Sequence, residues 1–342
     1  MVRLKDIAGL AGVSVMTVSK ALRDEPDVSA TTKTRIKVLA QQMGYVPDSS
    51  AQGLRNRTTK LLGLVISSVT NPTFSRVVLA IEERAYELGY DVVLAHSLNI
   101  PEREEACILR MLSRRVDGLL ISPVYRVATE ARIYDILASR HVPTVLLGHT
   151  APFCAQFVNV ASDDLQGGFS ATEHLIKLGH RRIAFLAGPP GTPWSKERFE
   201  GYRRALRQAD MDVDDKLVFQ AGRTIEDGAK AALQMINENC AVTAVQSAND
   251  LVAIGCAQFL LQQGLKIPQD ISVVGFGNVW LSQYFSVPLT TVRQPKFTLG
   301  VAAMEVMQEI LLGKRGDSKR LSAELIVRAS SGTAPAREAL AL

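Results

Sequence analysis

The 342-residue chain lacks three features that would have assigned it to a specialised class of protein. Its four cysteines are scattered without a CxxC pair, which argues against a disulfide framework or a zinc site and favours free thiols in a reducing compartment. No apolar run approaches the roughly 18 residues that a membrane span needs. The N-terminus has no apolar core of the kind found in secretory signals. We therefore expect a cytoplasmic protein with no membrane partner.

Signatures of catalysis are missing as well. The sequence contains no GxGxxG, P-loop, HExxH or GxSxG motif. Its five histidines are spread along the chain without the spacing of metal ligands. One of them, His180, follows Leu-Gly and precedes Arg-Arg between an expected helix and an expected strand, which favours a structural role. We expect neither an enzyme nor a bound metal or other cofactor.

What the chain does have is an uneven distribution of charge. Residues 1–60 hold ten Lys and Arg against five Asp and Glu, whereas the remainder holds 29 of each kind. The whole net charge of +5 therefore lies in the first sixth of the chain. A basic end of this kind is either a solvated face or a surface that contacts a polyanion.

Three short helices are expected in this basic head. The first covers about residues 4–11, where apolar residues recur at the spacing of one helical face. A Gly-Val-Ser turn follows, and Ser14 is a good N-cap for a second helix over residues 15–22. A third helix is expected over residues 30–43. Two short helices joined by a glycine-containing turn are typical of a helix-turn-helix, although a three-helix protein-binding module would show the same pattern.

The second helix carries the side chains that would read DNA. Its N-terminal residues would lie at base edges in the major groove, while hydroxyl and backbone N–H groups hold phosphates. Lys20 can donate to guanine O6 and N7, whereas Val15 and Met16 offer apolar contact suited to a thymine methyl. The full set of candidate DNA contacts on this helix is Ser14, Val15, Met16, Thr17, Ser19 and Lys20.

Residues 47–60 separate the head from the rest of the chain. Few of their side chains are apolar and Gly53 lies among them, so the segment cannot hold a helix by itself. In the free protein it is expected to be a linker.

From residue 61 onward, strand-like and helix-like runs alternate. Strands are expected at 61–67, 91–95, 117–122, 144–147, 182–187, 243–246 and 271–275. Helices are expected at 73–88, 101–115, 129–140, 163–178, 196–209, 225–238, 249–263 and 296–312. Apolar strands that alternate with helices argue for parallel sheets covered on both faces. So long a series fits two doubly wound lobes, with ligands bound between them at the carboxyl ends of the strands.

Ordered motifs along the chain resemble those of the LacI/GalR family of bacterial transcription regulators. In the head they are Lys5-Asp6-Ile7-Ala8, Gly12-Val13-Ser14, Thr17-Val18-Ser19-Lys20-Ala21-Leu22 and Gly44-Tyr45-Val46-Pro47. In the body they include Asn71-Pro72, Arg198-Phe199-Glu200-Gly201-Tyr202 and Ala248-Asn249-Asp250. The resemblance covers about residues 3–330. It implies a small all-α helix-turn-helix domain followed by an α/β body of two doubly wound parallel-sheet lobes, similar to type I periplasmic binding proteins.

The resemblance gives the linker a second state on DNA. In the family, two such segments fold together as hinge helices, and Leu54 matches the leucine that wedges between base pairs in the minor groove. Gly53 should make that folding more costly, by about 0.5–1 kcal/mol per chain. Because the family usually has Arg or His at the position of Lys20 and often a polar residue at Val15 or Met16, the operator sequence does not follow from the resemblance.

The resemblance also implies which residues contact the effector. Arg198 matches an arginine that bonds effector hydroxyls or carboxylates, although it could be a surface arginine on a helix. Asn249 and Asp163 match positions at the cleft, and either could instead be a simple helix N-cap. Asn71 and Phe74 are expected to line the other lobe, where Phe74 could equally belong to the core.

Two departures from the family bear on the charge of the effector. Where the family usually has an aspartate after a Val-Gly turn, this chain has Gly277 and Asn278, both candidate effector contacts. At Arg223, another candidate, related chains often have an aromatic residue. The loss of a negative acceptor and the gain of a cation favour an anionic ligand, such as a sugar acid, a sugar phosphate or another small carboxylate. Alternatively, Arg223 is exposed and Asn278 replaces the missing aspartate.

Together these features predict a sequence-specific transcriptional regulator, and most members of such a family are repressors. The expected domains are a helix-turn-helix over residues 1–46, a hinge over 47–60 and a two-lobed effector-binding and dimerisation domain over 61–342. A homodimer would place two heads on a pseudo-palindromic operator in double-stranded DNA. A sugar, or a sugar-derived acid or phosphate, would bind between the lobes. The rival interpretation is a cytosolic solute-binding or enzymatic α/β protein whose basic head docks a protein partner.

Overall fold

The computed structural model describes residues 2–46 and 58–336. The chain divides into two compact units, Met1–Thr59 and Lys60–Leu342. Most of the expected hinge lies outside the described residues. In the part of the chain that is described, no helix is both long and apolar enough to cross a membrane.

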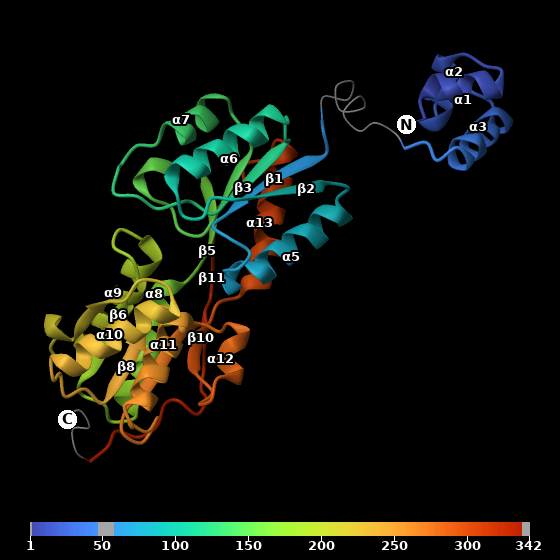
Figure 1. The fold of residues 1–342 in the computed structure, drawn as a ribbon. Helices are drawn as coiled ribbons and strands as arrows, with labels where there is room; N and C mark the ends of the chain where they lie inside the picture. The colour runs from blue at the N-terminus through green and yellow to red at the C-terminus, as the bar shows by residue number, and fades with distance from the viewer. Residues whose placement is uncertain (1, 47–57, 337–342) are drawn as a thin grey trace. The chain divides into compact units, whose positions relative to one another are not determined.

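The described part of the smaller unit is a bundle of three helices, drawn in blue in Figure 1. These are α1 (Leu4–Ala11), α2 (Val15–Leu22) and α3 (Ala30–Gln42). Ser14 and Ser29 cap the second and third helices, since each hydroxyl accepts a hydrogen bond from the backbone N–H three residues further on. Ile7, Val18 and Ile36 meet in the buried centre of the bundle. All three helices predicted for the head are confirmed.

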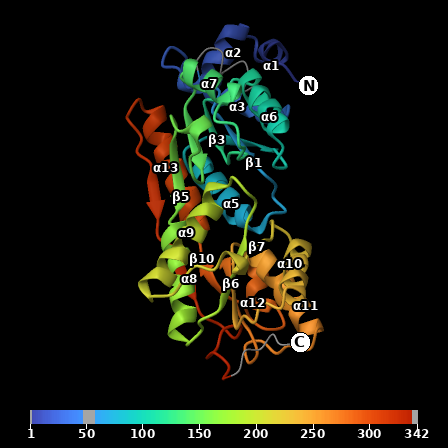
Figure 2. The same cartoon turned by 90° about the vertical axis from the view of Figure 1, so that its left-hand side faces the viewer.

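Within residues 58–336, the larger unit contains two six-stranded sheets with helices on both faces (Figures 1 and 2). The first lobe has the strand order β11-β5-β4-β3-β1-β2 and the second has β12-β10-β9-β8-β6-β7. The strands of the first lobe are β1 (Leu61–Ile66), β2 (Asp91–His96), β3 (Gly118–Ile121), β4 (Thr144–Leu147), β5 (Val158–Ser162) and β11 (Lys319–Leu321). Those of the second are β6 (Ile183–Ala187), β7 (Val218–Gln220), β8 (Ala244–Ser247), β9 (Ser272–Gly277), β10 (Thr290–Arg293) and β12 (Glu324–Ile326).

The helices divide between the lobes in the same way. The first lobe carries α5 (Pro72–Glu87), α6 (Pro101–Ser113), α7 (Arg132–Ser139) and α13 (Lys296–Leu311). The second carries α8 (Asp164–Lys177), α9 (Pro193–Gln208), α10 (Ile225–Asn237), α11 (Asp250–Gln262) and α12 (Trp280–Tyr284). Short 3-10 turns occur at Pro152–Cys154 and Asp215–Leu217.

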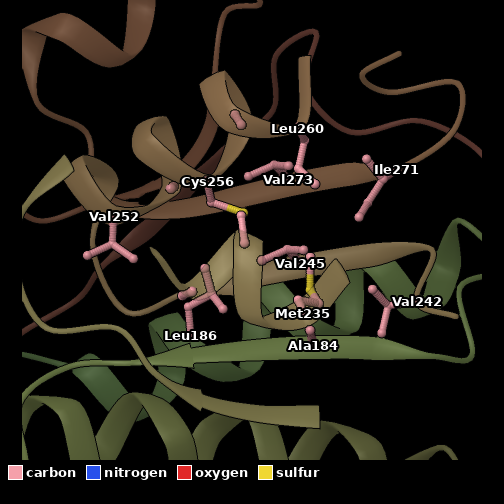
Figure 3. Packing of buried hydrophobic residues seen from close by; sticks show 14 of the residues in the cluster. Ala184, Leu186, Met235, Val242, Val245, Val252, Cys256, Leu260, Ile271 and Val273 are labelled. Carbon is pink, nitrogen blue, oxygen red and sulfur yellow. The ribbon is translucent and has the colours of Figure 1, made fainter. Parts of the chain in front are cut away.

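Successive side chains of a strand point to opposite faces of the sheet. Because helices cover both faces, the central strands of both sheets are buried on both sides. In the first lobe, Leu64 packs with α5 and α13, while Val65 packs with α6 and α7. In the second, Phe185 packs with α8 and α9, and Leu186 packs with α10 and α11. Figure 3 shows the last of these cores, with Cys256 among the aliphatic side chains. All four cysteines are buried free thiols.

Between residues 58 and 336, the chain passes from one lobe to the other three times. The crossings connect β5 to α8, β10 to α13, and β11 to β12. In each sheet these strands lie at one end of the strand order, whereas β2 and β7 are the strands at the other end. The three connections, called the crossings below, therefore join the lobes along one edge of the two sheets.

The strands and helices predicted for the body are confirmed, with bounds that differ by a few residues. The expected parallel order also holds, except that β12 pairs antiparallel with β10. The prediction missed β5, β7, β10, β11, β12 and α12, which are each three to five residues long. Segments this short carry only a weak periodic pattern, so some of them, such as β3 and β4, were predicted and others were not.

Candidate nucleic-acid interface and ligand cavity

The N-terminal turn of α2 presents an apolar tip flanked by hydroxyl groups. Val15 and Met16 are 46% and 61% exposed, although both are apolar. Ser14 accepts a hydrogen bond from the backbone N–H of Thr17 at 3.0 Å, and the two hydroxyl oxygens lie 2.9 Å apart. This end of the helix can therefore offer apolar contact to base edges, together with hydroxyl and backbone donors to phosphate.

Lys20 lies on the last turn of α2, and its side chain is one-third exposed. Its ammonium group forms an ion pair with the carboxylate of Asp27, and the hydrogen bond from Lys20 lowers the pKa of Asp27. The pair is on the surface, where water screens it. Lys20 can therefore exchange Asp27 for another acceptor, such as a guanine. Ser19, the neighbouring candidate, is half-buried. Leu54, the predicted minor-groove wedge, lies outside the described residues.

The larger unit encloses a cavity of about 420 Å³, which lies at the carboxyl ends of strands from both lobes. That volume is in the range of small-molecule sites. The first lobe contributes, among others, Asn71, Phe74, Asn99, Tyr125 and His149. The second lobe and the crossings contribute, among others, Asp164, Trp194, Arg198, Arg223, Asn249, Asp250, Phe276 and Gln294. Five of the eight predicted effector contacts are thus among the lining residues: Asn71, Phe74, Arg198, Arg223 and Asn249.

Arg198 of α9 is the most buried cation of this lining, with 6% of its surface exposed. Its Nη2 donates to Asp164 Oδ1 at 3.0 Å and its Nη1 to the carbonyl of Ala248. The guanidinium lies 3.7 Å from the ring centroid of Phe276 and 4.8 Å from that of Trp194. Its Nε is buried without a hydrogen-bond partner among the described residues. Arg198 is therefore held inside the protein by Asp164 and Ala248, and it is not a surface arginine.

Asp164, at the first crossing, is the carboxylate that the sequence analysis missed. It is 1% exposed, and its Oδ2 lies 2.7 Å from His149 Nε2 of the first lobe. Its Oδ1 accepts from Arg198 and from Ser162. Burial opposes ionisation, yet Arg198 and His149 hold the pKa of Asp164 below its ordinary value. Since the second nitrogen of His149 lies 3.4 Å from the Glu197 carboxylate, one imidazole connects the first lobe to two acidic side chains of the second.

Asp163, the predicted contact, is not part of the cavity lining. It is the N-cap of α8, where its Oδ1 accepts from the backbone N–H of Gln166 at 3.1 Å. The same oxygen lies 3.3 Å from Arg320. The N-cap interpretation therefore fits Asp163, and the next residue on the helix faces the cavity instead. Two adjacent acids in the sequence did not reveal which one would do so.

Arg223 and Asn99 meet across the cavity from different lobes. Arg223 Nη1 donates to Asn99 Oδ1 at 3.1 Å. Arg223 follows β7, and Asn99 follows β2 in a turn whose left-handed backbone, with φ of 57°, suits asparagine. Arg223 is half-buried rather than fully exposed, and this burial lowers the pKa of its guanidinium. Asn99 was not among the predicted contacts, since no motif marks it.

Asn71 and Asn249 combine two roles. Asn71 caps α5 by accepting from the backbone N–H of Thr73 at 3.1 Å, and Asn249 caps α11 by accepting from that of Val252 at 2.9 Å. Both also line the cavity, and so does Phe74, which packs against the core of the first lobe as well. The alternatives that the sequence left open at Asn249 and Phe74 are therefore compatible, and Asn71 has a capping role that was not predicted.

Gly277 and Asn278 differ from their predicted place, because the structure leaves them out of the cavity lining. The carbonyls of both accept from the buried ammonium of Lys296, whose pKa burial lowers to about 8. The Asn278 side chain accepts from Arg328 Nη2 at 2.7 Å. Its side-chain oxygen is thus bonded to Arg328, which is also outside the cavity lining.

Asp250 supplies the carboxylate that is buried in this region. Its oxygens accept from the backbone N–H of Val279 at 2.8 Å and from the hydroxyls of Ser282 and Thr291. These bonds fix the turn after β9 and leave the carboxylate occupied by protein donors. The acid therefore supports the cavity wall.

The remaining histidine of interest, His180, has a structural position. It is fully buried, and its ring nitrogens lie 2.9 Å from Thr243 Oγ1 and 3.1 Å from Ser272 Oγ. It thereby connects the starts of β6, β8 and β9, as its position in the sequence suggested. Among the described residues no three His, Cys, Asp or Glu side chains gather as a metal site would require.

Comparisons with known proteins match both units. The family model for bacterial regulatory proteins of the lacI family matches residues 3–48, and that for a periplasmic binding protein-like domain matches residues 172–331. The HTH-type transcriptional repressor PurR of Vibrio atlanticus is 32% identical over 335 residues, which are 97% of this chain and 99% of PurR.

Two solved structures are similar over nearly the whole chain. One is the Lac repressor dimer bound to operator and the anti-inducer ONPF, with a TM-score of 0.86 and 28% identity over 97% of this chain and 99% of that one. The other is the complex of the transcriptional regulator CelR with cellobiose, with a TM-score of 0.72 and 30% identity over 96% of this chain and 100% of that one.

Proposed function

The chain belongs to the lacI family of bacterial regulatory proteins and is a DNA-binding transcriptional regulator; from this premise we propose that it represses transcription and that a small polar ligand in the cavity controls its hold on DNA. The observation that carries the proposal is the combination of two sites in one chain. A capped helix with an exposed N-terminal tip is joined to a two-lobed body that encloses a cavity of ligand size.

On DNA, α2 would lie in the major groove of an operator half-site. Val15 and Met16 would contact thymine methyl groups, and Lys20 would donate to a guanine after leaving Asp27. Ser14, Thr17 and Ser19 would position the helix on phosphates. The predicted wedge by Leu54 stays part of this proposal, as does a hinge over residues 47–60 between a head over 1–46 and a body over 61–342.

The active form would be a homodimer on a pseudo-palindromic operator, as the dimeric Lac repressor complex with operator suggests. The ligand would be a sugar or a sugar-derived acid or phosphate, in line with the cellobiose complex of CelR. The protein would act in the cytoplasm, without catalysis, because its relatives are transcriptional regulators. The proposed ligand contacts are Asn71, Phe74, Arg198, Arg223 and Asn249.

Selection from a randomised pool of double-stranded DNA, with the full chain, tests the proposal. Enrichment of a two-fold symmetric motif is expected, with binding that weakens steeply as salt rises because phosphate contacts release counterions. Lys20→Ala should relax the base preference at one position of each half-site by roughly 1–3 kcal/mol. Lys37→Ala, on α3, serves as the control and should leave the motif unchanged. A pool without any preferred sequence would contradict the proposal and favour a head that docks a protein partner.

A further inference from the structure

The two arginines of the cavity are in different electrostatic states. Arg198 is neutralised by Asp164 at 3.0 Å. The guanidinium of Arg223 has no carboxylate within ion-pair distance among the described residues. Asp227 accepts from the backbone N–H of Arg223 rather than from its side chain. Since arginine stays protonated even where burial lowers its pKa, Arg223 places an unbalanced positive charge in the cavity wall.

The acidic groups of the cavity cannot balance this charge. Asp164 and Asp250 both line the cavity, but hydrogen bonds from the protein already occupy their carboxylates. The unpaired groups among the charged and amide side chains here are mostly donors, although the side-chain oxygen of Gln294 also makes no hydrogen bond among the described residues. Arg198 Nε is buried without an acceptor, and Asn99 Nδ2 makes no hydrogen bond in the part of the chain that the structure describes. A ligand that completes this site must supply acceptors and negative charge.

We infer that the ligand of this cavity carries a carboxylate or phosphate group, and that Arg223 and Asn99 bind this group from opposite lobes. The inference rests on the proposed function and specifies its ligand. Arg223 presents several N–H donors in a planar fork, of which only Nη1 has a side-chain acceptor, Asn99 Oδ1. The Asn99 amide can add its own N–H to the same anion. The ring of Trp194, whose centroid lies 5.7 Å from the Arg223 guanidinium, supports the cation from the side.

The position of this pair in the fold gives the anion a mechanical effect. The three crossings lie at the edge of the sheets formed by β5 and β11 in one lobe and by β10 and β12 in the other. Asn99 follows β2 and Arg223 follows β7, the strands at the far edge of each sheet. When the lobes open about the crossings, groups at that far edge separate most. An anion held by both residues therefore favours the closed arrangement of the lobes.

Isothermal titration calorimetry on the full chain tests the inference with four probes at matched ionic strength. They are inorganic phosphate, D-gluconate, D-glucose 6-phosphate and, as the neutral reference, D-glucose. Saturable phosphate binding is expected, and Arg223→Gln should weaken it by roughly tenfold or more, since a hydrogen bond to a charged group is lost. Arg223→Lys should restore part of the loss. Gluconate binding tighter than that of glucose 6-phosphate would identify a carboxylate as the preferred group, and the reverse order a phosphate.

Asn99→Asp is a second variant that leaves the arginine in place. It sets a carboxylate opposite Arg223 and should weaken phosphate binding by a similar factor, since the cation is then neutralised. Arg204→Gln and Asn239→Asp are matched controls, since Arg204 is an exposed arginine on α9 and Asn239 another asparagine with positive φ. Both should bind phosphate like the wild type.

Absence of saturable phosphate binding, or equal binding by Arg223→Gln and the wild type, would overturn the inference. So would glucose binding at least as tight as that of both anionic sugars. If glucose alone bound and shifted operator affinity, the inference would fall and the proposed function would stand. If phosphate bound through Arg223 but none of the probes altered operator affinity, the anion subsite would stand and ligand control would fall.

Discussion

Replacing Asp164 by asparagine should destabilise the larger unit, because it removes the counterion of a buried arginine. Asp164 and Arg198 are 1% and 6% exposed, so water cannot substitute for the lost charge. The variant side chain keeps nearly the same volume and one acceptor oxygen. Any loss of stability therefore reflects the removed charge and not an empty space left by a smaller side chain.

The size of the effect follows from what remains around Arg198. Breaking a buried ion pair from one side costs about 3–5 kcal/mol. Arg198 would still donate to Ala248 and lie against the rings of Phe276 and Trp194, which places the expected loss near the lower end of that range, at about 3 kcal/mol. The loss includes weaker attachment of His149, whose Nε2 would face an amide in place of a carboxylate.

The adjacent residue offers a matched control. Asp163→Asn also turns an acid into an amide, but asparagine is an equally good N-cap. The ion pair of Asp163 with Arg320 lies on the surface, where it contributes at most about 1 kcal/mol. Urea unfolding of both variants at a fixed protein concentration, followed by circular dichroism, compares their free energies of unfolding. Equal midpoints for the transition of the larger unit would refute the electrostatic reasoning.

The pH dependence supplies an independent check. Because the folded-state pKa of Asp164 lies below its ordinary value of 3.8, the ionised carboxylate contributes its full stabilisation above that pH. The contribution is lost as the pH falls through the folded-state pKa. The difference between the wild type and Asp164→Asn should therefore be constant from about pH 5 to 7 and shrink below about pH 4. A difference that grows on acidification would contradict this sign.

Two further changes test the packing of the lobes. Gly201→Ala should destabilise the second lobe by roughly 1–3 kcal/mol, although alanine has the more favourable helix propensity. The reason is that the new Cβ would lie 2.2 Å from the carbonyl oxygen of Leu165. An unchanged melting temperature would show that α8 and α9 can move apart at little cost. Glu104→Gln should lower the free energy of unfolding by about 2–3 kcal/mol, because Glu104 is fully buried and accepts from Val124 N–H, Tyr134 and Arg126. Equal urea midpoints for Glu104→Gln and the exposed control Glu102→Gln would contradict the importance of that buried network.

The sequence predicted the elements that have strong local signals. The serine caps and the glycine turn of the head defined its three helices, and the alternation of apolar strands with helices in the body defined two parallel-sheet lobes. Strands such as β7 and β12 were not predicted, since each is only three residues long and is stabilised by its neighbours in the sheet rather than by its own sequence pattern. Their existence depends on pairings between residues far apart in the chain.

The cavity was predictable to the extent that its residues belong to motifs. Arg198 and Asn249 lie in such motifs and line the cavity as expected. Asp163 and Asp164 are adjacent in the sequence. Which of them lines the cavity depends on the residue at which α8 begins after the crossing, and tertiary structure determines that residue. Asn99 had no signal, because its importance comes from Arg223, a residue more than a hundred positions away that reaches it across the two lobes.

The arrangement of charges also determines which contacts can transmit a signal. A ligand shifts an equilibrium between two states only through contacts that differ between them. His149 and Asp164 meet close to the crossings, where an opening of the lobes about the crossings would separate them least. Arg223 and Asn99 meet at the far edge, where a small rotation breaks the 3.1 Å contact. A ligand bound only near Arg198 would therefore add affinity with little bias toward closure, whereas one that also engages the far edge couples its binding free energy to the relative position of the lobes.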